Sequence, residues 1–108
     1  FKVEFGSKNI DVSPAGVKDD NVKNCHVSGH HHLIINDAYD VLGNAKKPIP
    51  YGKNILHFGG GQTFANLSLP PGKYSLQLAL GDYEHRPVET LDKNSLVLSE
   101  IIQIEVLP

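Results

Sequence analysis

The sequence predicts an all-β protein, an immunoglobulin-like antiparallel β-sandwich of about seven short strands. Short segments with apolar residues at every second position recur roughly every 8–12 residues. Clusters of Gly, Pro, Asn and Asp stand between these segments and mark turns. No segment shows the three- and four-residue apolar spacing of an amphipathic helix. A small β-barrel is the alternative fold.

Length and composition narrow the class of protein. The chain has 108 residues, which fits a single domain over residues 1–108. Ten basic and twelve acidic residues give a formal charge of -2 with no cationic run, so we expect no nucleic-acid partner. No apolar run approaches the ~20 residues of a membrane span. No signal-peptide pattern stands at the start, and because the first residue is Phe1 we expect an upstream segment.

The first part of the chain is predicted to contribute two short strands and a long loop. Residues 2–5 alternate between charged and apolar side chains, and residues 10–12 form a second extended piece. A turn follows at residues 13–16, and residues 17–28 are polar without a clear period. The single Cys25 in this loop cannot form an internal disulfide, and we expect it to be a half-buried small hydrophobe.

Residues 30–36 are predicted to form the central strand, whose side chains alternate between two faces. One face carries His31, Leu33 and Ile35, and the other carries His30, His32 and Ile34. We expect the first, more apolar face to point into the core, with His31 as a structural residue bonded to backbone. The second face would line a groove or solvent, with its two histidines roughly 7 Å apart along the strand.

Two further strands are expected in the middle of the chain. A long connection of breakers and solvated residues spans 37–52, and residues 54–58 form a strand that ends at a triple glycine. The triple glycine lacks the Lys-Ser/Thr and the following helix of a phosphate loop, which argues against nucleotide binding. Residues 63–69 form the next strand. Its inward side chains are predicted to be Ala65, Leu67 and Leu69.

The last part of the chain shows the clearest alternation. A Pro-Pro-Gly corner precedes a strand at residues 73–80, and Tyr74 directly follows that corner. This arrangement is similar to the corner of immunoglobulin-like sandwiches, where a Tyr hydroxyl bonds back to backbone. A loop at 81–95 carries His85, and a final strand is predicted over 96–106. Its inward side chains are predicted to be Ile102, Ile104 and Val106.

Four blocks of the sequence stand out together. They are GHHHLII at residues 29–35, HFGGGQT at 57–63, LPPGKYSLQL at 69–78 and LGDYEH at 80–85. In this order they resemble a bacterial family filed as a domain of unknown function, number 4399 in that series. The resemblance runs from about residue 12 to about residue 106, which is nearly the whole chain.

This resemblance implies an exported bacterial domain, periplasmic or secreted, with no established activity. Three positions depart from the family pattern. Asn36 separates Ile35 from Asp37, Tyr74 replaces a histidine, and Val88 stands where a second loop histidine is expected. The residue types that recur are His30, His31, His32, His57, Gly59, Gly61, Gln62, Thr63, Gly81, Asp82 and His85.

The histidines favour a metal site. Imidazole is a common ligand of zinc and copper, and a His-x-His pair on one strand face can place two nitrogens on one ion. We therefore predict His30, His32 and His57 as ligands of a copper or zinc ion, with His85 as a fourth. Asp82 is expected either as an oxygen ligand or outer hydrogen-bond acceptor, or simply as the cap of a turn.

Three functions remain open on these residues. The first is metal binding for storage or delivery. The second is a structural or protein-interaction domain without metal, which would contact another periplasmic protein. The third is a small metal-dependent enzyme, although no Ser or Cys nucleophile motif is present and we do not expect an enzyme. An open coordination position would favour the enzyme, whereas four protein ligands would favour storage, delivery or structure.

Overall fold

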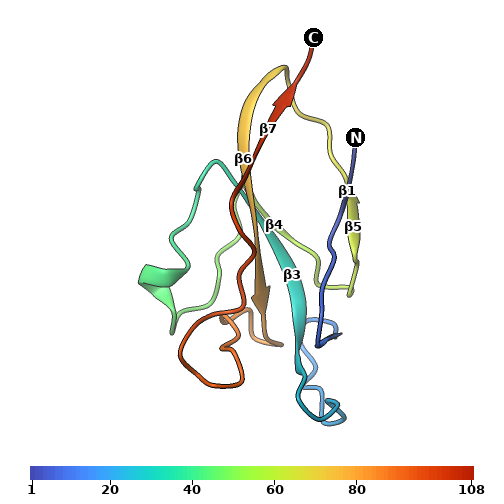
Figure 1. Ribbon diagram of the computed structural model, residues 1–108, viewed down its shortest axis with the longest axis vertical. Helices are drawn as coiled ribbons and strands as arrows, with labels where there is room; N and C mark the ends of the chain where they lie inside the picture. Colours follow the sequence, from blue (N-terminus) through green and yellow to red (C-terminus); the bar gives the residue numbers. More distant parts are fainter.

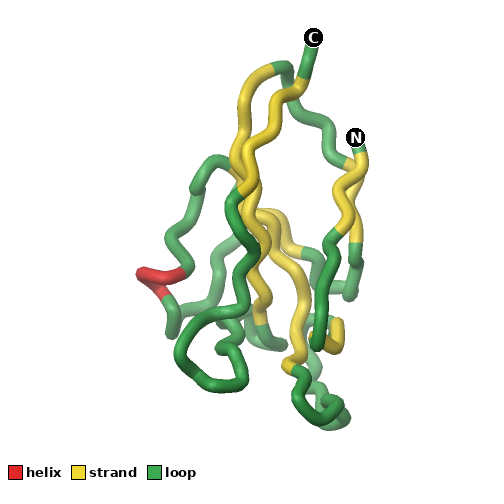
Figure 2. Tube along the Cα trace, in the orientation of Figure 1, coloured by secondary structure: helices red, strands yellow, loops and turns green.

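Seven strands and one 3-10 turn make up the regular structure of the computed structural model, which describes residues 1–108 (Figures 1 and 2). The strands are β1 (Lys2–Glu4), β2 (Ile10–Val12), β3 (Val27–Ile35), β4 (Ile55–His57), β5 (Phe64–Asn66), β6 (Gly72–Gly81) and β7 (Ile102–Val106), and the turn is η1 (Leu42–Asn44). The predicted all-β class is therefore confirmed. No helix is long and apolar enough to cross a membrane.

The strands form two sheets that stay open. β1 and β5 pair as a small antiparallel sheet, which stands apart from β6 and β7 in the upper half of Figure 1. The larger sheet has the order β2-β3-β6-β7, and β4 also pairs with β3. Two sheets that do not close on themselves make a β-sandwich, so the barrel alternative is wrong. One pair departs from the predicted antiparallel arrangement, because β2 runs parallel to β3.

Both faces of β3 are buried, which corrects the expectation that one face lines a groove or solvent. Leu33 and Ile35 belong to a core cluster with Ala65 of β5, Leu76 of β6 and Phe5, which directly follows β1. Ile34, on the opposite face, packs with Val41 and Ile49 in a second cluster. The physical reason is the connection at residues 37–52, which folds back over this face and places its own apolar side chains there. His30 and His32 consequently have no solvent exposure.

The predicted corner before β6 is present. The Tyr74 hydroxyl donates a hydrogen bond of 2.6 Å to the backbone carbonyl of Pro70. This bond fixes the turn between the small sheet and the large one. The hydroxyl bond was predicted from the corner and its tyrosine, and that detail is confirmed.

The last predicted strand is shorter than expected. Only Ile102–Val106 forms β7, and the preceding residues contribute isolated bridges, Glu89 to Leu96 and Ala79 to Leu98. Ile102 was expected to point inward, yet half of its surface is exposed. The reason is that β7 is an edge strand, paired on one side only.

The connections also depart from expectation in two places. β3 begins at Val27, within the segment predicted as a loop, because its first residues pair with β2. Cys25 was expected to be half-buried, but it is exposed. Its backbone is left-handed, with a φ of 63°.

Candidate metal centre

Three elements bring four histidines together at one end of the large sheet. His30 and His32 lie on β3, and their alternation places both side chains on the same face. His57 ends β4 and is the direct cross-strand partner of His32. His85 belongs to the loop after β6, whose last residue, Gly81, pairs with His30. The structure thus brings together all four histidines predicted as ligands.

One ring nitrogen of His85 lies close to a ring nitrogen of each of the other three histidines. His85 Nδ1 lies 3.1 Å from His30 Nε2, 3.3 Å from His32 Nε2 and 3.2 Å from His57 Nδ1. All four nitrogens lie within 4.8 Å of one another. Around an ion with metal–nitrogen distances of 2.0–2.1 Å, neighbouring nitrogens of a tetrahedron are about 3.3 Å apart. A square plane would instead place one of the three partners about 4.1 Å from His85.

The distances from His85 therefore match one corner of a tetrahedron. Two ligands of one ion at this bond length are at most about 4.2 Å apart. Because the four nitrogens span up to 4.8 Å, the most widely separated pair would have to close by about 0.6 Å to share any single ion and by about 1.5 Å to form a tetrahedron. The four donors are therefore gathered at one place, but binding an ion would draw them closer together.

The proton on His57 is fixed by a backbone carbonyl. His57 Nε2 lies 2.8 Å from the carbonyl oxygen of Pro50, which can only accept a hydrogen bond. Nε2 therefore carries the proton, and the lone pair remains on Nδ1, the atom that faces the other histidines. A metal-ligating imidazole commonly donates its second nitrogen to a carbonyl in this way.

A tight loop presents the His85 ring. The Asp82 side chain accepts hydrogen bonds from the backbone N–H groups of Glu84 and Arg86. His85 itself has a left-handed backbone, with a φ of 65°, which is uncommon for a residue with a side chain. Of the roles considered for Asp82, the structure shows the turn cap. Its carboxylate is not among the converging ligand atoms.

Two glycines allow the strands to approach closely beside the site. A Cβ atom on Gly81 would lie 2.3 Å from Cε1 of His32, and one on Gly29 would lie 2.4 Å from the carbonyl oxygen of Gly81. Neither position has room for a side chain. Gly29 and Gly81 stand in two of the four sequence blocks, and their role is to let the His32 ring lie against the end of β6.

Burial keeps the inner histidines neutral. Burial, followed by the proximity of His85 and His57, lowers the pKa of His30 to about 4. Burial, followed by the proximity of His30, lowers the pKa of His32 to about 3. Burial also lowers the pKa of His57, although its hydrogen bond to Pro50 opposes the shift. Neutral imidazole is the form that binds a metal ion, so these three rings are ready to act as ligands near pH 7.

The inner pair also carries unpaired polar atoms. The Nδ1 atoms of His30 and His32 are buried without a hydrogen-bond partner within the protein. An unsatisfied buried polar atom typically costs about 1–3 kcal/mol. These atoms are not the Nε2 atoms that face His85, so an ion bound through Nε2 would leave them unpaired.

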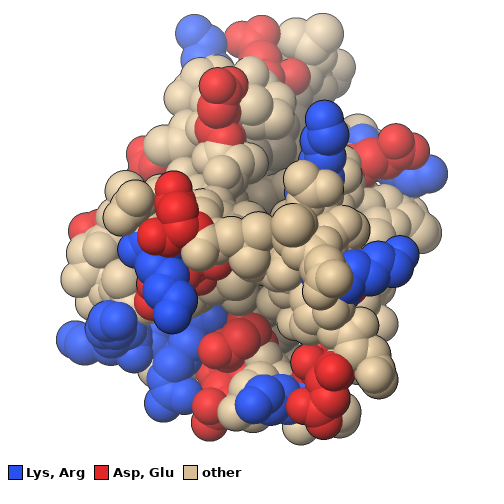
Figure 3. Space-filling view, turned by 60° about the horizontal axis from the view of Figure 1, so that its bottom comes forward, with Lys and Arg blue, Asp and Glu red and all other residues tan.

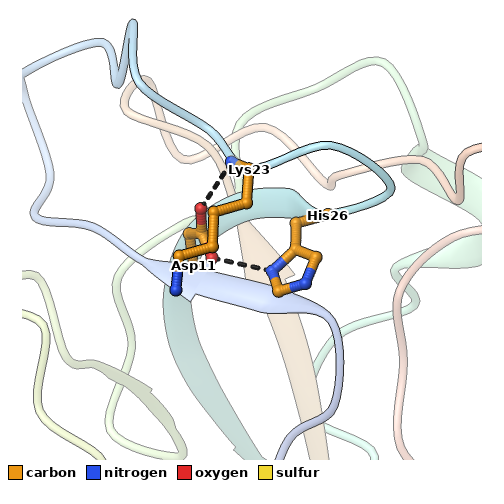
Figure 4. Close-up of polar contacts among 3 residues, drawn as sticks. All are labelled: Asp11, Lys23 and His26. Atoms are coloured by element: carbon orange, nitrogen blue, oxygen red, sulfur yellow. Dashed lines mark hydrogen bonds and ion pairs between the residues drawn. The ribbon is translucent and has the colours of Figure 1, made fainter.

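The remaining two histidines lie outside the cluster. His31 is buried on the opposite face of β3 and packs against the Phe5 ring, with centroids 5.3 Å apart, as its predicted structural role requires. The hydrogen bond expected for it is absent at Nε2. His26 bonds to Asp11 at 2.8 Å, and Asp11 also accepts the backbone N–H of Lys23 (Figure 4). This contact ties the 17–26 loop to β2 and lowers the pKa of Asp11, first through Lys23 and then through His26.

Sequence reasoning missed the segment that supports the cluster from the connection between η1 and β4. Tyr51 stacks on the His57 ring, with centroids 3.9 Å apart and planes inclined by 12°. The neighbouring Pro50 and Ile49 bond to His57 and His85 through their backbones. No periodicity marks this segment, and its two prolines read only as breakers. The one feature of the sequence that could have indicated this segment is Tyr51, an aromatic residue directly after Pro50.

The family of the chain follows from a comparison over nearly its whole length. Residues 3–107 match the family described as Domain of unknown function (DUF4399), which is the family that the four sequence blocks resemble. No curated protein matches the chain significantly, and no solved structure does. Three of the four blocks contain the four converging histidines, so the fold brings these distinctive parts of the sequence to one place. The chain belongs to the DUF4399 family of domains of unknown function.

Proposed function

We propose that this protein binds one transition-metal ion through His30, His32, His57 and His85. The observation that carries the proposal is the spacing of three ring nitrogens at 3.1–3.3 Å from Nδ1 of His85. Packing alone gives such an arrangement little stability, because the ring nitrogens compete for the same few protons. A bound cation would satisfy all four lone pairs at once.

The ligand set suits copper or zinc. All four donors are neutral imidazoles, which are of the borderline softness that zinc, copper and nickel prefer. The three distances from His85 favour Zn(II), whose structural sites are tetrahedral, over Cu(II), which prefers tetragonal geometry. The general order of affinities favours Cu(II). The two ions therefore belong in the same experiment.

Four protein ligands favour storage, delivery or a structural role over catalysis. A catalytic zinc typically has three protein ligands and one position for water or substrate. Here four side chains are available for four positions. We further propose that the protein works outside the cytoplasm, in the periplasm or as a secreted domain, which rests on the family resemblance. Both charge signs are interspersed over the loop end (Figure 3), so no strong field of one sign is expected to draw in charged partners.

A titration of untagged, metal-free protein with Zn(II) and with Cu(II) tests this proposal. One equivalent should bind tightly, and the double substitution His32→Ala/His57→Ala should weaken binding by at least about 100-fold, as expected when ligands are lost. His26→Ala is the matched control, because this histidine lies outside the cluster, and it should bind as the parent does. Circular dichroism checks that each variant is folded.

Equal affinity of the doubly substituted and parent proteins would overturn the proposal. Because His32 is fully buried, its removal can also unfold the domain. His85→Ala then provides the decisive comparison, since this ring is partly exposed and stands on a loop. A folded His85→Ala variant that retains the parent affinity would likewise exclude the site.

A further inference from the structure

One short segment contacts both of the cluster histidines that reach solvent. Residues 49–51 precede β4, and their middle residue accepts the proton of His57 Nε2 through the Pro50 carbonyl at 2.8 Å. On one side of it, the Ile49 N–H donates to the backbone carbonyl of His85 at 2.7 Å. On the other side, the Tyr51 ring stacks on His57. We call residues 49–51 the strap.

The strap is anchored at one end and exposed at the other. Ile49 is 2% exposed and belongs to the second core cluster, whereas Tyr51 is 76% exposed. The Tyr51 ring nonetheless lies nearly parallel to His57, and its centroid is 5.7 Å from that of His85. Because most of the Tyr51 side chain is exposed, burial stabilises its position little. Its ring contacts at the site are with His57 and His85.

The four histidines divide into an inner and an outer pair. His30 and His32 are held by β3 and have no exposure, while His57 and His85 are only partly covered. Any ion must therefore enter and leave past the outer pair. The inner pair is fixed by the sheet, but the outer pair has the strap as its shared contact.

We propose that the strap positions the outer ligands, with the Tyr51 ring and the Pro50 carbonyl holding His57 in its coordinating orientation and so slowing release of the ion. Tyr51 is a positioning residue, since it contacts a ligand and not the ion. This proposal rests on the proposed metal-binding function. It adds residues that no sequence block contains and assigns them control over how long the ion stays bound.

The test substitutes the exposed ring of the strap. Tyr51→Leu removes the stacking surface, Tyr51→Phe retains it without the hydroxyl, and Phe64→Leu removes an exposed aromatic ring on the other sheet as a control. Stacked aromatic pairs contribute an amount that corresponds to about a 2- to 12-fold change in an equilibrium constant. Tyr51→Leu should therefore speed dissociation of Zn(II) to an added chelator by about 2- to 12-fold and raise Kd by the same factor.

The variants should separate positioning from general stability. Tyr51→Phe should restore the parent dissociation rate, Phe64→Leu should leave it unchanged, and no variant should alter the unfolding midpoint of the metal-free protein appreciably. A dissociation rate and Kd in Tyr51→Leu equal to those of the parent would overturn the proposal. So would a rise in both association and dissociation rates at constant Kd, because the ring would then act only as a barrier.

A second measurement keeps this inference separate from the proposed function. In metal-free protein, nitrogen-15 NMR of the His57 ring reports which nitrogen carries the proton. The parent should show the proton on Nε2, and Tyr51→Leu should show a mixture of the two forms. A parent that binds no metal but shows this difference refutes the metal site and retains the positioning role. An identical His57 ring in parent and variant refutes the strap, whatever the metal result.

Discussion

His85 is the residue on which the four-histidine arrangement depends. Its Nδ1 atom is within hydrogen-bond distance of a nitrogen on each of the other three rings. In the metal-free protein the lone pair of His85 Nδ1 can accept a hydrogen bond from only one of the three neighbouring nitrogens at a time. At the other two contacts, the lone pairs of two ring nitrogens therefore lie close together. The resulting repulsion and the burial of the inner rings make the cluster costly without an ion. This cost should be visible in the response of stability to pH.

The metal-free protein should become less stable between pH 7 and pH 5. The folded pKa values of His30 and His32, about 4 and about 3, lie below the unfolded value of 6.5. The neutral rings therefore contribute stability that is fully present above about pH 6.5 and is lost as the pH falls towards the folded values. From pH 7 to pH 5 the loss is about 2 kcal/mol for each ring, since only the unfolded chain takes up the proton.

Urea unfolding at the two pH values measures this loss. The carboxylates with lowered pKa, Asp11 and Asp92, titrate below this window and do not contribute to it. NMR provides the residue-level check, because the ring signals of His30 and His32 should not titrate between pH 7 and pH 5. Equal free energies of unfolding at both pH values, or ring titration near 6.5, would contradict the account.

At the scale of elements, β3 organises the molecule. It pairs with β2, β4 and β6, and both of its faces are buried. Its alternation could be read from the sequence, which is why the division of His30 and His32 from His31 was correct. The burial of both faces could not be read, because it depends on how the 37–52 connection folds over Ile34. Side chains alternate between the two faces with a period of two in every strand, whether one face or both faces are covered by other residues.

The contact between β3 and β6 depends on Gly81. Replacing Gly81 with Ala would place a methyl group 2.3 Å from Cε1 and 2.9 Å from Nδ1 of His32, so the ring must move. Overpacking of this kind typically costs about 1–3 kcal/mol. Gly81→Ala should therefore lower the free energy of unfolding by that amount and weaken Zn(II) binding by at least about 10-fold, since a displaced ligand cannot keep its geometry.

Gly6→Ala is the matched control for this substitution. A methyl group on Gly6 would have nothing within 4 Å, so stability should change by less than about 0.5 kcal/mol and affinity should not change. Urea unfolding and a Zn(II) titration of both variants measure the difference. If Gly81→Ala behaves like Gly6→Ala in both assays, the close approach of β6 to His32 does not support the site.

At the scale of the whole molecule, the fold converts separated sequence blocks into one site. His32 is 53 residues from His85 in the sequence, yet their nitrogens are 3.3 Å apart. The blocks and the chemistry of imidazole were sufficient to predict which four histidines converge. The donor atoms were not predictable, because the choice of Nδ1 on His57 follows from the Pro50 carbonyl, a contact made through the fold. The strap was missed for the same reason.

We propose that four nitrogens share one ion: Nε2 of His30 and His32, and Nδ1 of His57 and His85. The most direct measurement is nitrogen-15 NMR of the histidine rings during addition of Zn(II) to untagged, metal-free protein. We expect these four nitrogens to shift together and to saturate at one equivalent, with the proton of His57 retained on Nε2 and His31 unaffected. Four rings that do not respond, or a response at the opposite nitrogens, would contradict it.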